Sequence, residues 1–501
     1  MTETYNASTL LDRNLEAGRG DKVAVHWAGG SVTYRRLHGL ACAAGRRFEE
    51  LGVRREERIL LPLDDSPAMM AAFWGAIRIG AVPVPVNPLL QRSEDYDHYL
   101  ADSLARVVVV DAMTGEKVGG AVARAPGAVK VVDAAEILAL PPAETSPAAT
   151  GRDDVAFWLY SSGSTGLPKG VVHLQHDIEY TCETYARQVL GITEADTTFS
   201  TTKMFHAYGL GNSLSFPCWA GATTVLLSGR PTPAAALETI ERNRPTLFFS
   251  APTLYNAILN QEGARERDLS SIRQCVAAAE ALPAEVWRRW KEAFGLTIID
   301  GIGSTELLHI YCSNRPDDVR PGSSGKPVPG YELKVLDLDG SPVPDDQAGD
   351  MYVKGDSALA FYWRQHEKTK RSLLGEWFFS GDRYRRDADG FYWYEGRSDD
   401  MIKVSGLWVS PIEVEGVLLE HPAVGESAVV GIEVDGFMKI KAFVIAKVEG
   451  SPELVAELQE HCKSRLQRYQ FPHLIEFVPE LPKTITGKIQ RYKLRERTPV
   501  A

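Results

Sequence analysis

Short apolar runs alternate with helical patterns between residues 58 and 300, and this alternation constrains the fold more than any other feature. The runs are RILLPL, RVVVVDA, VAFWLY, TTVLL, TLFFSAP and LTIID, each with the length and residue types of a strand. One segment between them, DIEYTCETYARQVLG, repeats apolar residues at helical spacing behind Asp177, which can cap a helix. Strands that alternate with helices predict βαβ units around a mostly parallel sheet, and therefore an α/β fold.

The pattern changes after residue 301, and it changes again near residue 397. SSGKPVPGYELKVLDLDGSPVPDDQAGDMYVKG combines short strands with Gly/Pro turns and predicts a small, barrel-like antiparallel β subdomain. Two strands, the helix PELVAELQEHCKSRLQRY and a lysine-rich tail follow, enough for an α+β domain of roughly 100 residues. We therefore expect a large N-terminal domain over residues 1–396, a hinge at 397–399 and a small mobile C-terminal domain over 400–501.

Charge and cysteine usage exclude several classes of protein. Lys and Arg total 55 against 66 Asp and Glu, a net charge of -11, so no basic field favours nucleic acid or an anionic membrane. The six cysteines lack CxxC spacing, which argues against a zinc site and a disulfide framework. The first residues do not resemble an export signal, and the most apolar run, MMAAFWGAI, ends at Arg78. We expect a cytoplasmic enzyme without a membrane span.

The segment YSSGSTGLPKGV, residues 160–171, is typical of a phosphate-binding loop. A strand that ends in hydroxyls and glycines presents backbone N–H groups and side-chain donors together, and Lys169 adds a cation. The P-loop register fails, because Lys169 follows Pro168 and precedes Gly170 instead of standing in Gly-Lys-Ser/Thr. A flexible Ser/Gly linker is disfavoured, because the loop lies between two strand-like runs.

This loop resembles the phosphate-binding signature of the acyl-adenylate-forming superfamily, which includes acyl-CoA synthetases, adenylation domains of peptide synthetases and luciferases. Three further segments match motifs of that superfamily in the same order: DGIGSTE, FFSGDRYRRDADGFYWYEGRSDD and LPKTITGKIQR. The resemblance covers nearly the whole chain. It implies that an acid and MgATP form an acyl-AMP and pyrophosphate, and that a thiol then displaces AMP.

The resemblance also implies roles for individual residues. Thr305 would lie near the α-phosphate, Glu306 would orient Mg²⁺, and Asp382 would accept hydrogen bonds from the ribose. A carboxylate that attacks the α-phosphorus meets charge repulsion, which a metal and hydrogen-bond donors offset. The residues assigned to catalysis are Lys488, Thr165, Glu306 and His206. Those assigned to ATP or AMP are Ser161, Ser162, Gly163, Ser164, Thr165, Gly166, Lys169, Asp300, Gly301, Ile302, Thr305, Asp382 and Arg397.

In the superfamily the C-terminal domain rotates after adenylation, and the resemblance places the hinge at Asp399. The rotation would withdraw Lys488 and bring the KVSGLWVSP loop to the active site, where Gly406 leaves room for the thiol arm of coenzyme A. An ordinary turn glycine is the alternative for Gly406. The residues assigned to the thioester step are Lys403, Ser405, Gly406 and Leu407.

The acid-binding segments KMFHAYGLGNSL and GSTELLHIYCSN look most like the benzoate-CoA ligase branch. The residues expected to line a slot for an aromatic ring are Ala207, Tyr208, Ala278, Ala279, Gly303, His309 and Ile310, with His206 gating or positioning the acid. Packed core roles remain open for Tyr208 and His309. Ala279 replaces a glycine usual in that branch, and one methyl beside the ring is worth roughly 1 kcal/mol of selectivity.

We therefore expect an AMP-forming ligase that acts on benzoate or 2-aminobenzoate (anthranilate), with ATP, Mg²⁺ and coenzyme A. A stand-alone adenylation enzyme that loads a carrier-protein phosphopantetheine is the alternative, because sequence does not show which thiol accepts the acyl group. A P-loop NTPase is disfavoured by the loop register. A non-catalytic nucleotide-binding protein is disfavoured because Glu306 and Lys488 are both present. We expect a monomer or a homodimer.

Overall fold

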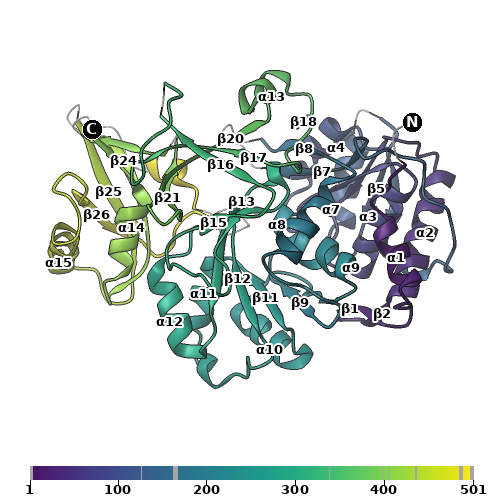
Figure 1. Cartoon of the computed structure of the whole chain (residues 1–501), viewed down its shortest axis with the longest axis horizontal. Coiled ribbons are helices and arrows are strands. Elements are labelled where there is room, and N and C mark those ends of the chain that lie inside the picture. The colour runs from purple at the N-terminus through teal and green to yellow at the C-terminus, as the bar shows by residue number, and fades with distance from the viewer. Residues whose placement is uncertain are drawn as a thin grey trace.

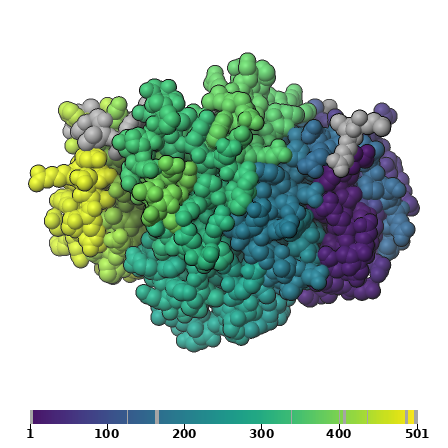
Figure 2. Space-filling view, viewed as in Figure 1, coloured from purple at the N-terminus to yellow at the C-terminus, as the bar shows by residue number. Residues whose placement is uncertain are grey.

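The computed structural model describes residues 4–125, 127–161, 167–337, 339–398, 400–404, 407–434, 437–483 and 489–496. Figure 1 shows the chain as an elongated molecule in which the small C-terminal part lies at the end opposite to the N-terminal helices. Figure 2 shows the same order on the surface, from purple N-terminal residues at one end to yellow C-terminal residues at the other. No helix within the described ranges is long and apolar enough to cross a membrane.

The largest sheet has nine strands in the order β15-β14-β13-β12-β11-β9-β10-β1-β2. The six strands from β13 to β1 are parallel, and antiparallel pairs finish the sheet at both edges. The predicted runs TTVLL, TLFFSAP and LTIID supply three of the parallel strands. The bounds are β1 Val23–Trp27, β2 Gly30–Thr33, β9 Thr197–Ser200, β10 Thr223–Val225, β11 Leu247–Ser250, β12 Gln274–Ala277, β13 Ile298–Gly303, β14 Ile310–Ser313 and β15 Lys326–Pro327.

Helices α10 (Pro233–Asn243), α11 (Pro252–Leu259) and α12 (Ala284–Phe294) cover one face of this sheet. Each helix begins at or beside a proline, as the first turn of a helix allows, and each turns its apolar stripe toward the strands. Trp290 and Tyr255 are fully buried in the layer between them. The sheet and its helices therefore form the predicted α/β body, and the strand ends at Ala277 and Gly303 open toward the candidate site.

A second sheet, β4-β3-β5-β6, is wholly parallel. Its strands are β3 Arg58–Leu61, β4 Val82–Pro85, β5 Val107–Val110 and β6 Lys130–Asp133, and its helices include α2 Tyr34–Glu50, α3 Pro67–Arg78, α5 Gly115–Arg124 and α6 Ala134–Ala139. All of α3 is buried, which explains its apolar sequence. A Cβ on Gly75 would lie 2.5 Å from the carbonyl oxygen of Ala41, so glycine is needed where α3 crosses α2.

One predicted strand pairs differently from the expectation. VAFWLY forms β7 (Val155–Ser161), which pairs antiparallel with β8 (Lys169–Leu174), and β8 pairs antiparallel with β18 (Phe361–Tyr362). The interpretation of this run as part of a βαβ unit was wrong. Only residues 162–168 separate the two strands, which is enough for a hairpin, whereas parallel strands need a crossover of a dozen or more residues.

The segment behind Asp177 is helical but begins differently. It forms α7 (Asp177–Thr181) and continues as a π-helical turn, Cys182–Arg187, whose Cys182 and Tyr185 are buried as the spacing predicts. Asp177 is the first helical residue and not the cap, since His176 occupies the cap position. The Asp177 carboxyl group instead lies 2.7 Å from His173 Nδ1 and accepts a hydrogen bond from the backbone N–H of Leu174.

The predicted antiparallel β subdomain is present. Its strands are β16 Glu332–Leu336, β17 Gly349–Lys354, β19 Leu373–Leu374, β20 Trp377–Arg386 and β21 Tyr392–Arg397, and α13 (His366–Ser372) directly precedes β19. Every pairing in this five-stranded sheet is antiparallel. The sheet lies between the α/β body and the C-terminal part (Figure 1).

The C-terminal part has the predicted α+β composition. Its elements are β22 Ile402–Val404, β23 Leu407–Val409, α14 Pro411–Leu419, β24 Val424–Val434, β25 Phe437–Ala446, α15 Pro452–Lys463, β26 Leu474–Phe477 and α16 Arg491–Glu496. Its two apolar clusters are drawn only from residues 402–494. These separate cores support the proposed domain boundary at 397–399.

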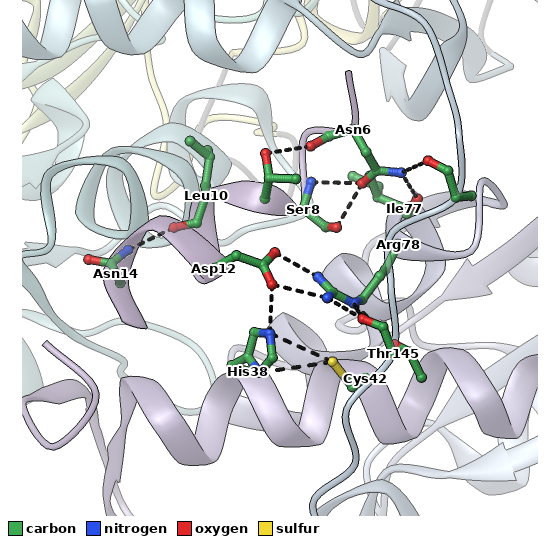
Figure 3. Close-up of polar contacts among 12 residues, drawn as sticks. Asn6, Ser8, Leu10, Asp12, Asn14, His38, Cys42, Ile77, Arg78 and Thr145 are labelled. Atoms are coloured by element: carbon green, nitrogen blue, oxygen red, sulfur yellow. Dashed lines mark hydrogen bonds and ion pairs between the residues drawn. The ribbon is translucent and has the colours of Figure 1, made fainter. Parts of the chain in front are cut away.

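A polar cluster joins the first helices (Figure 3). The guanidinium of Arg78 donates to both carboxylate oxygens of Asp12, on α1 (Thr9–Glu16), at 2.7 and 3.0 Å. His38 Nε2 lies 2.9 Å from Asp12 Oδ1, and Arg78 Nε donates to the carbonyl oxygen of Thr145 at 2.9 Å. The cluster therefore connects α1, α2, α3 and the segment before β7.

Candidate active site

The two ends of the predicted phosphate loop are fixed by one helix. β7 ends at Ser161 and β8 begins at Lys169, and α4 (Asp97–Ser103) contacts both stems. Tyr160 donates to Asp102 Oδ2 at 2.8 Å, and His98 Nε2 lies 2.7 Å from the carbonyl oxygen of Pro168. The loop residues Ser162, Gly163, Ser164, Thr165 and Gly166 lie outside the described residues.

Glu306 is the point at which the loop stems and the DGIGSTE segment meet. Its Oε1 accepts a hydrogen bond from Ser161 Oγ at 3.3 Å and lies 3.3 Å from Lys169 Nζ. Burial alone would raise the pKa of the Glu306 carboxyl, but the charge of Lys169 and a hydrogen bond from Tyr362 bring it below its ordinary value. Two motifs more than 130 residues apart thus form one anionic centre with a cation beside it.

Tyr362 is a site residue that sequence reasoning missed. Its hydroxyl donates to Glu306 Oε1 at 2.9 Å and lies 3.3 Å from Lys169 Nζ, whose ammonium is 4.3 Å from the centre of the ring. Burial and the charge of Glu306 raise the pKa of Tyr362, so the hydroxyl keeps its proton and acts as a donor. β18 carries it there by pairing with β8, a long-range contact for which the local sequence FYW gives no signal.

The DGIGSTE segment forms the end of β13 and a 3₁₀ turn, Thr305–Leu307, capped by Ser304. A Cβ on Gly303 would lie 2.5 Å from the carbonyl oxygen of His309, so the turn from β13 to β14 requires glycine here. Gly301 and Ile302 pair with β14. Burial raises the pKa of Asp300 well above its ordinary value, and its Oδ1 has no hydrogen-bond partner within the described residues.

The predicted ribose residues face each other across two strands. Asp382 on β20 is paired in register with Arg397 on β21, and Arg397 Nη1 donates to Asp382 Oδ1 at 3.1 Å. The pKa of buried Tyr311 is raised by burial first, then by the charge of Asp382, with Arg397 and Glu306 also acting on it. The Asp382–Arg397 pair and Glu306 therefore all act on the same buried tyrosine.

The predicted aryl residues also come together. Ala207 and Tyr208 begin α8 (Ala207–Leu210), and the ring centres of Tyr208 and His309 are 5.5 Å apart. The Tyr208 hydroxyl donates to the carbonyl oxygen of Val276 on β12, the strand that leads to Ala278. Ile310 pairs with Gly303 at the start of β14, directly after His309.

His309 is held as a neutral ring. Burial lowers its pKa to about 3, and its Nε2 lies 3.3 Å from Asn212 Oδ1. Its other ring nitrogen, Nδ1, is buried without a hydrogen-bond partner within the described ranges, and so is the hydroxyl of the neighbouring Tyr185. The ring centres of Tyr185 and His309 are 5.2 Å apart, so the aryl region contains unused hydrogen-bonding capacity.

Ala279 has a backbone conformation that favours glycine. Its φ is 75°, in the left-handed region, and its side chain is exposed. An L-residue in this region costs roughly 1 kcal/mol through contact of Cβ with the following carbonyl oxygen. The glycine usual at this position therefore has a backbone reason.

The remaining predicted residues fall into two groups. His206 is half-buried immediately before α8, and its ring centre lies 4.2 Å from that of Phe205. Lys403 is exposed on β22. The predicted residues Asp399, Ser405, Gly406 and Lys488 lie outside the described residues, as does the side chain of Leu407.

The residues present fit a magnesium ion held chiefly by a nucleotide. Within the described ranges no group of three or more His, Cys, Asp or Glu side chains could hold a metal by itself. Mg²⁺ in nucleotide enzymes is usually held by substrate phosphates and one or two carboxylates. Glu306, ionised and adjacent to the phosphate-loop stems, supplies one such carboxylate.

Comparisons with known proteins agree with this geometry. The chain matches the AMP-binding enzyme family over residues 11–363 and the C-terminal domain of AMP-binding enzymes over residues 413–488. It is 47% identical to a benzoate–CoA ligase of Thauera aromatica, over 99% of this chain and 96% of that protein.

Two solved structures share the fold over nearly the whole chain. A crystal structure of an anthranilate CoA ligase in complex with anthranoyl-AMP has a TM-score of 0.95 and 41% identity, over 99% of this chain and 98% of that one. A benzoate CoA ligase from Burkholderia xenovorans LB400 has a TM-score of 0.92 and 44% identity, over 98% of this chain and 100% of that one.

Proposed function

The chain belongs to the AMP-binding enzyme family, and from this premise we propose that it is an ATP-dependent aryl-acid:CoA ligase. It joins a small benzoate-type acid to AMP with release of pyrophosphate, and then transfers the acyl group to the thiol of coenzyme A with release of AMP. The preferred acid is benzoate or 2-aminobenzoate. Relatives with benzoate–CoA ligase and anthranilate CoA ligase activity support this assignment.

One observation carries the proposal. Glu306, in the anionic centre beside the phosphate-loop stems, and His309, in the aromatic cluster, lie three residues apart on a single turn between β13 and β14. An acid whose ring contacts His309 and Tyr208 would present its carboxylate toward the same end of the turn as Glu306. The turn thereby supports direct attack of an aryl carboxylate on a phosphate bound at the loop.

The chain's own residues would act mainly through charge and position. Lys169 and the hydroxyl of Ser161 offset negative charge at the phosphates, and Asp382 and Arg397 hold the ribose. Glu306 would hold Mg²⁺, which, when bound, neutralises phosphate charge. Lys488 would add a second cation for adenylation, and rotation about Asp399 would exchange it for the loop that contains Gly406.

The unused polar atoms bear on the choice of acid. A ring with an amino or hydroxyl group can pair with His309 Nδ1 or the Tyr185 hydroxyl, whereas unsubstituted benzoate leaves both unpaired. A site that bonds a substituent discriminates strongly against an analogue that lacks it. Comparison of benzoate with 2-aminobenzoate therefore measures whether these two atoms face the ring.

The test is AMP release by the purified protein with MgATP and a panel of benzoate, 2-aminobenzoate, hydroxybenzoates, cinnamates and medium-chain fatty acids, with and without coenzyme A. CoA-dependent AMP release with one small benzoate supports the ligase and names its acid. Acid-dependent pyrophosphate exchange that coenzyme A does not change would favour a carrier-protein acceptor. Activity confined to fatty acids would contradict the aryl assignment.

A further inference from the structure

A buried histidine connects the strand of the phosphate loop to the Glu306 turn. His173 lies on β8, four residues after Lys169, and both it and Asp177 are fully buried. Its Nδ1 lies 2.7 Å from Asp177 Oδ2, and its Nε2 lies 2.8 Å from the carbonyl oxygen of Thr305. The ring stacks on Phe157 with ring centres 5.2 Å apart.

The partners define which atoms donate. A backbone carbonyl oxygen can only accept, so Nε2 donates to Thr305. Asp177 Oδ2 also accepts the backbone N–H of Leu174 at 3.1 Å, so the Asp177 carboxyl group is held between the imidazole ring and the backbone. The His173 ring therefore links Asp177 to the Thr305 carbonyl through both of its nitrogens, and both side chains are fully buried.

Stability alone is a weak reason for such a pair. Taking polar groups out of water is costly even when they are hydrogen-bonded, and well-packed apolar residues of similar volume are often at least as stable. A buried hydrogen-bonded pair instead defines one arrangement of the segments that it joins. Here the segments are β8, which begins with Lys169, and the turn that presents Glu306.

The contact acts on the peptide next to the anionic centre. The carbonyl of Thr305 and the N–H of Glu306 belong to the same peptide group, so the bond from His173 fixes the plane of that group. The next two carbonyls are held from outside as well, because Leu359 N–H donates to Glu306 at 2.7 Å and Ser357 Oγ donates to Leu307 at 2.8 Å. Among these three donors, His173 alone reaches the turn from the strand that carries Lys169.

We propose that His173, paired with Asp177, is a positioning residue for adenylation. It sets the Thr305–Glu306 peptide relative to Lys169, so that the carboxylate and the ammonium face the same phosphates. This inference rests on the proposed function. Misplacement of reacting groups by about 1 Å can lower a rate by about 100-fold, so loss of the contact should reduce kcat more than ground-state binding.

The test compares three variants of the full-length protein by acid-dependent ATP–pyrophosphate exchange. His173→Phe keeps an aromatic ring that can stack on Phe157 but removes both hydrogen bonds, and Asp177→Asn replaces the partner carboxyl group with an amide of nearly the same shape. His38→Phe is the matched control, because buried His38 pairs with the partly exposed carboxylate of Asp12, and this histidine–aspartate pair contacts none of the proposed site residues. Thermal melting of each variant reports its stability separately.

We expect His173→Phe to lower kcat for exchange at least about tenfold, with the KM for the acid changed less than about twofold. Asp177→Asn should lower kcat by a smaller factor, and His38→Phe should leave kcat within about twofold of the wild type. A folded His173→Phe protein with wild-type kcat would overturn the inference. If that variant does not fold, wild-type kcat in Asp177→Asn overturns it. A wild-type protein that shows no exchange with any acid overturns the proposed function and this inference together.

Discussion

Tyr362→Phe removes one oxygen atom from the Glu306 centre and should destabilise the folded protein without any ligand present. The hydroxyl donates to Glu306 Oε1 at 2.9 Å in a buried environment. Hydrogen bonds to charged groups contribute about 1.5–3 kcal/mol, and Ser161 and Lys169 remain as partners of the same oxygen. We therefore expect the free energy of unfolding to fall by about 2 kcal/mol.

The assay is urea unfolding, followed by far-UV circular dichroism, of the wild type, Tyr362→Phe, Glu306→Gln and the double variant. Because the two residues are in contact, the cycle should give a coupling energy of about 1–2 kcal/mol. Tyr311→Phe is the matched control, since the buried hydroxyl of Tyr311 has no partner within the described residues. Its removal should leave the free energy of unfolding unchanged or raise it, because no hydrogen bond is lost and a buried unpaired hydroxyl is removed. Equal effects of the two Tyr→Phe changes, or strict additivity in the cycle, would refute the reasoning.

Three further predictions concern other parts of the chain. The hydrogen bond from His38 to Asp12 raises the pKa of His38 to about 9, so the pair stabilises the fold fully below about pH 6.5 and loses this contribution as the pH rises through about 9. Thermal melting from pH 6 to pH 9.5 should show a shallower fall for His38→Phe than for the wild type. Arg491→Met breaks the two 2.8 Å contacts to buried Glu415 and should destabilise the C-terminal domain by about 3 kcal/mol, seen as faster limited proteolysis of residues 400–496. Ala279→Gly should raise the free energy of unfolding by up to about 1 kcal/mol in the same urea assay, and a decrease would contradict the strain argument.

Sequence reasoning predicted most of the fold because strand length, helical spacing and turn residues are local signals. The runs between residues 58 and 300 became strands, and the changes of pattern after residue 301 and near residue 397 mark the β subdomain and the C-terminal α+β region. The pairing of VAFWLY was predicted wrongly because an apolar run does not specify its partner. Only the length of the following loop, short enough for a hairpin, carried that information.

The candidate site likewise contains residues that the sequence could predict and residues that it could not. Ser161, Lys169 and Glu306 lie within compact motifs whose residue types reveal phosphate chemistry, so sequence could nominate them. Tyr362 and His173 could not be nominated. Tyr362 reaches Glu306 because β18 pairs with β8. His173 contacts the backbone carbonyl of Thr305, and every residue has such a carbonyl, so the sequence does not indicate the contact. Residues that shape a site through strand pairing or through the main chain become visible only in three dimensions.

Ala279 shows how a departure noticed in sequence can receive a different cause from structure. From sequence, its methyl was expected to act on the substrate ring. In the structure the residue has φ 75° and an exposed side chain, one position beyond buried Ala278. The methyl therefore contacts its own backbone whether or not a ring is bound, and strain at this position is a property of the free protein. Any effect on acid selectivity would follow from relaxation of that backbone as well as from direct contact with the ring.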